Sequence, residues 1–130
     1  MQATTVSKGQ FWAGTIISVS ASLFLILDAV MKLVKPKFVV EATVQLGYPE
    51  STIIPLGVVL LLSTLLYLYP KTSVLGAILT TGYLGGAVAT HVRVGSGAFP
   101  VFFAVTFGVL VWFGLYVRDQ NLQTLLPLRK

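Results

Sequence analysis

Two pairs of ionisable residues stand near the ends of long apolar stretches, where acid–base chemistry is possible. Asp28 and Lys32 are four residues apart, so a helix would place them on one face. His91, the single histidine of the chain, and Arg93 close another apolar stretch. A carboxylate and an imidazole are the groups that most often carry protons in proteins. The two pairs therefore predict a polar site inside an otherwise apolar molecule.

Four apolar segments must position these residues, and they span about 11–33, 52–69, 73–92 and 99–117. Each is long enough to cross a bilayer, which takes about 20 helical residues. The chain has 130 residues, of which 55% are hydrophobic and only 10% are charged. Soluble domains have about 25% charged residues, so a soluble protein is excluded. We predict a single all-α domain over residues 1–130, integral to the membrane.

The connections between the segments predict an up-down transmembrane bundle of four helices. Pro36 and Gly47 bracket a stretch that favours a short helix near the interface, between spans one and two. We expect this helix to carry Glu41 over the mouth of the bundle. The topology then places the candidate residues at one end of the bundle, which are Asp28, Lys32, Glu41, His91 and Arg93.

The opposite end gathers aromatic and basic residues, which are Trp12, Tyr67, Tyr69, Trp112, Tyr116, Lys8, Lys71, Arg118, Arg129 and Lys130. This composition predicts an interfacial aromatic belt on the cytoplasmic side, with both termini in the cytoplasm. After Arg118 and Asp119 we expect a polar tail. The basic residues flank the spans rather than form a patch, so the net charge of +5 does not indicate a nucleic-acid partner.

Two interpretations of the ionisable residues stand side by side. In the first, Asp28 and Lys32 form an ion pair within one helix and nothing more. In the second, Asp28 reaches Arg93 or His91 across the bundle. The second interpretation gives a ligand-binding site at the non-cytoplasmic end, made of Asp28, Lys32, Glu41, Tyr83, His91 and Arg93.

Two further patterns concern the walls of that site. Gly82 and Gly86 are one helical turn apart, a spacing that favours close packing against a neighbouring helix. Phe99, Phe103 and Phe107 form an aromatic line on span four. Core packing or lipid contact is the ordinary explanation of such a line, but facing inward it would form an apolar wall for a flat ligand.

The residue inventory restricts the cofactors. The chain has no cysteine, which excludes disulfides and thiolate metal sites. One histidine excludes a metal site built from several histidines, and it also argues against haem held by two histidines. We therefore expect no metal, and haem is disfavoured.

The order of these motifs resembles the DoxX-like family of small four-span bacterial membrane proteins. The resemblance covers residues 11–127 and rests on Asp28-x-x-x-Lys32-Leu33, Leu46-Gly47-Tyr48-Pro49, Gly82-Tyr83-Leu84-Gly85-Gly86-Ala87, Thr90-His91-x-Arg93 and Arg118-Asp119. It implies a four-helix fold in the bacterial inner membrane. It also implies an association with quinones or redox partners, because the family is named after a subunit linked to quinone-dependent sulfur oxidation. Most members have no established activity.

Three functions are compatible with these observations. The leading hypothesis is a subunit of a membrane redox system that binds a quinone or another small hydrophobic molecule, with a redox protein as partner. The second is a non-catalytic membrane partner or assembly chaperone. Under either hypothesis the protein could be a homo-oligomer. The third is a small membrane isomerase or hydratase with a lipophilic substrate, in which Asp28, Glu41 and His91 are the acid–base candidates.

Overall fold

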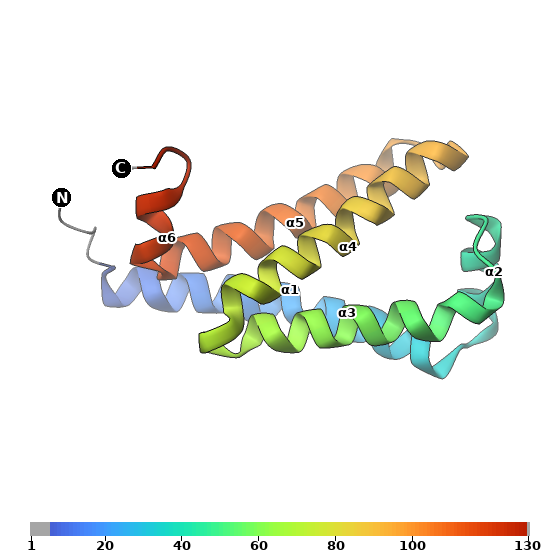
Figure 1. Cartoon of the computed structure of the whole chain (residues 1–130), viewed down its shortest axis with the longest axis horizontal. Helices are drawn as coiled ribbons and strands as arrows, with labels where there is room; N and C mark the ends of the chain where they lie inside the picture. Colours follow the sequence, from blue (N-terminus) through green and yellow to red (C-terminus); the bar gives the residue numbers. More distant parts are fainter. Residues whose placement is uncertain (1–5, 130) are drawn as a thin grey trace.

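Four long helices dominate the computed structural model, which describes residues 6–129 (Figure 1). They are α1 (Lys8–Val34), α3 (Ile53–Leu68), α4 (Ser73–Val94) and α5 (Ala98–Arg118). Each of them is long and apolar enough to cross a membrane, when α3 is taken with the turn before it as Glu50–Leu68 and α4 likewise as Pro70–Val94. The predicted four-helix transmembrane bundle is confirmed, and its spans lie close to the boundaries expected from the sequence.

Short helices connect or follow the spans. They are α2 (Lys37–Gln45), the 3-10 turns η1 (Glu50–Thr52) and η2 (Pro70–Thr72), and α6 (Gln120–Leu125). The short helix between the first two spans is therefore confirmed. The expected polar tail, however, contains α6. The carboxylate of Asp119 accepts from the N–H groups of Asn121 and Leu122, and Leu122 joins the hydrophobic core at 5% exposure.

Local chemistry explains where the helices begin and end. At the start of α1, the hydroxyl of Ser7 accepts from the N–H of Gln10, and the Gln10 side chain accepts from the N–H of Ser7. This reciprocal capping box satisfies two amide groups that the first helical turn leaves free. At the end of α4, Gly95 adopts a left-handed conformation (φ +70°), which glycine takes without steric cost.

Figure 1 shows the long helices as two pairs, α1 with α3 and α4 with α5. The two pairs pack against each other through α1 on α5, the most extensive contact between the helices, and through α3 on α4. The two pairs lie together at one end of the bundle, called the narrow end below, which holds the start of α1 and the end of α5 (Figure 1). They diverge towards the other, wide end, where α2 stands (Figure 1). The bundle is therefore wedge-shaped, and its open side is the end that carries the candidate residues.

Glycines set the close contacts at the narrow end. A Cβ atom on Gly14 of α1 would lie 2.6 Å from the carbonyl oxygen of Gly114 on α5, and one on Gly76 of α4 would meet the backbone of Tyr67 on α3. The prediction that Gly82 and Gly86 pack against a neighbouring helix is wrong, because no atom of another helix lies within 4 Å of a Cβ placed on either. Their faces point into the open part of the wedge, where the helices are apart.

Tyr67 also departs from the sequence expectation, since it belongs to the core and not to an interfacial belt. It is only 1% exposed, and its hydroxyl oxygen lies 2.6 Å from the carbonyl of Val111 and 2.8 Å from the hydroxyl of Ser18. A phenol has one proton and a carbonyl can only accept, so Tyr67 donates to Val111 and accepts from Ser18. Trp12 and Tyr69 remain exposed at 56% and 55%, as belt residues should be.

Candidate functional site

A cavity of about 640 Å³ occupies the open part of the wedge. Residues from α1, α2, α4 and α5 line it, with Leu56 of α3 and Tyr48 of the loop after α2. Its volume lies within the roughly 300–1,000 Å³ that small-molecule sites usually have. Since α2 stands across the wide end of the bundle, the helix forms the outer wall of this space (Figure 1).

Phenylalanine rings build one wall of the cavity, from Phe24 on α1 and from Phe99, Phe103 and Phe107 on α5. The ring of Phe24 is stacked on that of Phe107 with centroids 4.6 Å apart, and it meets the ring of Phe103 edge-on at 5.4 Å. Phe103 and Phe107 therefore face the cavity together with Phe24 of α1. By contrast, Phe99, at the end of the aromatic line on span four, borders the cavity and is 76% exposed. This wall offers flat apolar surfaces to a ligand.

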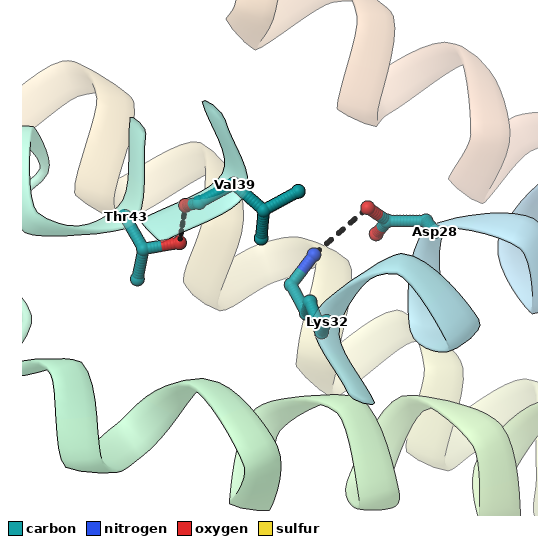
Figure 2. Close-up of polar contacts among 4 residues, drawn as sticks. All are labelled: Asp28, Lys32, Val39 and Thr43. Carbon is teal, nitrogen blue, oxygen red and sulfur yellow. Dashed lines mark hydrogen bonds and ion pairs between the residues drawn. The ribbon is translucent and has the colours of Figure 1, made fainter. Parts of the chain in front are cut away.

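Asp28 and Lys32 lie on the polar side of the same cavity. Lys32 Nζ donates to Asp28 Oδ1 over 2.8 Å, and Figure 2 shows the pair beside Val39 and Thr43 of α2. The Lys32 side chain is 16% exposed, while that of Asp28 is 44% exposed. Among the bonds of the described chain, Asp28 makes none to Arg93 or His91, so the pairing within one helix is the arrangement present.

Three further residues with hydroxyl groups line the polar side of the cavity, namely Tyr83, Tyr48 and Thr90. The Tyr48 hydroxyl lies 2.6 Å from the hydroxyl of Thr90, which itself donates to the carbonyl of Gly86 over 2.8 Å. Because the single hydroxyl proton of Thr90 is already donated to the Gly86 carbonyl, Tyr48 donates its hydroxyl proton to the oxygen of Thr90. The bond ties the loop after α2 to α4. Sequence reasoning did not place Tyr48 or Thr90 in the site, although both belong to motifs that carried the family resemblance.

His91 and Arg93 sit at the wide end of α4 with different partners. His91 lines the cavity, and its Nδ1 lies 3.0 Å from the hydroxyl of Ser96. Arg93 donates to the carbonyl of Leu46 over 2.8 Å, and its guanidinium lies against Gly47, where a Cβ atom would be only 3.1 Å from Nη2. Arg93 therefore fastens the loop after α2 to α4, outside the cavity lining.

Glu41 stands apart from the other candidates. It lies on the exposed face of α2, with its carboxylate 4.0 Å from the Lys37 ammonium and its side chain 60% exposed. The expectation that Glu41 points towards the charged set is wrong. Helix α2 turns Val39 and Thr43 towards the cavity, which leaves Glu41 on the outer side.

Comparison with known proteins settles the family. The sequence pattern that defines the DoxX-like family matches residues 16–114. The chain belongs to the DoxX-like family. No curated protein and no solved structure matches the chain. The family match and the four apolar helices establish a multi-pass integral membrane protein.

The cavity of this DoxX-like protein combines flat apolar surfaces with hydrogen-bond donors, and it offers little for acid–base catalysis by three residues. Lys32, Tyr83 and His91 can donate hydrogen bonds, and the phenylalanine wall can stack on a ring. The three acid–base candidates are not brought together, because Glu41 lies outside the lining. Within residues 6–129 no group of three side chains is placed to hold a metal ion.

Proposed function

We propose that this DoxX-like protein binds a quinone, or a small hydrophobic molecule with a similarly flat polar head, as part of a redox system of the bacterial inner membrane. The single observation that carries the proposal is the two-sided cavity. It has an aromatic wall led by Phe24 and Phe103, and a polar side that contains the Asp28–Lys32 pair. Pockets of this kind bind amphipathic ligands, because the apolar wall supplies area and a few polar groups fix the orientation.

A quinone suits both walls. Its ring can lie against the phenylalanines, and its two carbonyl oxygens can accept hydrogen bonds from Lys32 on one side and from Tyr83 or His91 on the other. Reduction to the quinol takes up two electrons and two protons. In the proposal a redox protein partner supplies the two electrons, and the two protons come from water by way of Asp28 and His91, which both line the cavity.

The charge distribution supports an orientation for this site. Within residues 6–129, four cations at the narrow end join no ion pair, namely Lys8, Lys71, Arg118 and Arg129, against Arg93 alone at the wide end. In the proposal the narrow end and both termini therefore face the cytoplasm, as the positive-inside rule favours. The cavity then opens towards the non-cytoplasmic side of the membrane.

Ligand analysis on matched variants tests the proposal. The protein is extracted in a mild detergent, and bound small molecules are identified by mass spectrometry. Binding of decylubiquinone is then measured for the wild type, Phe103→Ala and Phe102→Ala. Phe103 lines the cavity, whereas its neighbour Phe102 is 67% exposed and outside the lining.

We expect Phe103→Ala to weaken binding about threefold to tenfold, the value of one aromatic contact. Phe102→Ala should bind as the wild type does. Equal binding by both variants would contradict the proposal. A co-purified protein without any small molecule would instead favour the hypothesis of a non-catalytic membrane partner.

A further inference from the structure

A second cavity, of about 630 Å³, lies at the narrow end of the bundle, remote from the proposed quinone site. The first residues of α1 line it, together with Ser73 at the start of α4 and the end of α5. Figure 1 shows that the start of α1, the turn between α3 and α4, and α6 gather at this end. Its lining combines two cations, Lys8 and Arg118, with the apolar side chains of Phe11, Trp12 and Leu115.

Arg118 has hydrogen-bonding capacity that the described chain does not use. Its Nε donates to the hydroxyl of Ser18 over 3.3 Å, and the guanidinium carbon lies 5.9 Å from the centre of the Tyr67 ring. Within residues 6–129 its two terminal nitrogens have no acceptor and it joins no ion pair. A half-buried guanidinium presents its remaining donors as a planar fork, which fits two oxygens of a phosphate.

The carboxylates of the protein are distributed so that they leave this end positive. Three of the four acidic residues form ion pairs at the α2 end, with Lys32, Lys35 and Lys37. The fourth, Asp119, lines the narrow-end cavity, but its carboxylate accepts from two backbone N–H groups of α6. Helix dipoles add little to this positive field, because the positive starts of α1 and α4 lie at the same end as the negative ends of α3 and α5.

We propose that this narrow-end cavity binds the phosphate of an anionic phospholipid. The phosphate oxygens accept from Arg118 and Lys8, and the glycerol and upper acyl chains lie along Phe11, Trp12 and Leu115. Trp12 is 56% exposed and belongs to the predicted aromatic belt, whose rings meet lipid headgroups. A lipid fits the lining better than a free phosphate, because the apolar side chains next to the cations have no role with an inorganic ion.

Native mass spectrometry of the full chain in detergent tests the assignment. Phosphatidylglycerol and phosphatidylcholine with the same acyl chains are titrated, so that only the headgroup charge differs. The variants are Arg118→Gln and Lys8→Gln, with Lys37→Gln as the matched control. Lys37 is 90% exposed at the opposite end of the bundle, and its replacement removes the same charge as that of Lys8.

The wild type should bind phosphatidylglycerol at least about fivefold more tightly than phosphatidylcholine, since one basic residue is worth about 1 kcal/mol at an anionic lipid. Arg118→Gln should lose about tenfold in phosphatidylglycerol affinity, and Lys8→Gln about fivefold. Lys37→Gln should match the wild type. If Arg118→Gln fails to fold, the phosphatidylglycerol affinities of Lys8→Gln and Lys37→Gln are compared instead, and only Lys8→Gln should show a loss.

Three results would overturn the proposal. The first is equal affinity of the wild type for the two lipids. The second is a loss in Lys37→Gln as large as in Lys8→Gln, which would indicate unspecific attraction. The third is displacement of the lipid by millimolar inorganic phosphate, which would identify a site for the free anion.

Discussion

At Gly76 the backbones of α3 and α4 leave no room for a methyl group. A Cβ there would lie 2.6 Å from the carbonyl carbon of Leu66, and still closer to the backbone of Tyr67. Ordinary contact begins at 3.4 Å, so the first of these distances alone is short by about 0.8 Å. The obstacles are backbone atoms, which cannot turn aside as the end of a flexible side chain can. Gly76→Ala therefore has to push the two helices apart.

The expected cost is about 2–3 kcal/mol, near the upper end for overpacking, because the separation also disturbs the buried Tyr67 hydroxyl. Gly85→Ala is the matched control on the same helix. No atom lies within 4 Å of a Cβ at Gly85, so this substitution should stabilise the protein by up to about 1 kcal/mol through helix propensity. The two changes are chemically identical and should have opposite signs.

Thermal unfolding in detergent, followed by circular dichroism at the helix band, measures both variants. Gly76→Ala should melt well below the wild type and Gly85→Ala slightly above it. A Gly76→Ala protein as stable as the wild type would refute the close contact of α3 and α4. A destabilised Gly85→Ala would show that the face carrying Gly85 is packed against a partner.

Three further predictions follow from described contacts. Tyr67→Phe removes both hydrogen bonds of a buried hydroxyl and should lower the free energy of unfolding by about 1–2 kcal/mol, measured by the same melting experiment. Asp28→Asn leaves Lys32 without its carboxylate, and loss of this partly exposed ion pair should lower the free energy of unfolding by about 1–2 kcal/mol. The protein should therefore stay folded while its quinone occupancy, measured by mass spectrometry, falls. Unchanged occupancy would show that the pair does not belong to the binding site. Ser96→Cys should react with an impermeant thiol reagent outside intact cells, and labelling only after lysis would reverse the orientation.

The fold was predictable because a bilayer imposes a simple rule on the sequence. Apolar runs of about 20 residues become helices, since the backbone must satisfy its own hydrogen bonds in lipid. Pro36 and Gly47 likewise mark the short helix between the first two spans. These signals are local in the chain, so they need no knowledge of which helices meet.

The candidate site was predictable only in part, for the opposite reason. Asp28 and Lys32 share a helix face, so their pairing is a local property. The partner of Arg93 is a carbonyl in a distant loop, and no spacing in the sequence indicates it. Gly82 and Gly86 have the spacing of a contact motif, yet the wedge keeps their face open. Spacing shows which residues share a face, but packing determines what that face meets.

Because the helices are packed closely only at the narrow end, each helix can tilt about that end. The contacts of Gly14 with Gly114 and of Gly76 with Tyr67 are the pivot of such a tilt, and the cavity lies towards the opposite ends of the helices. A helix of 20 residues is about 30 Å long, so one degree of tilt moves its far end by about 0.5 Å. A tilt of about four degrees would therefore change the width of the proposed binding site by about 2 Å while the glycine contacts hold, so the proposed site would accommodate ligands of different size.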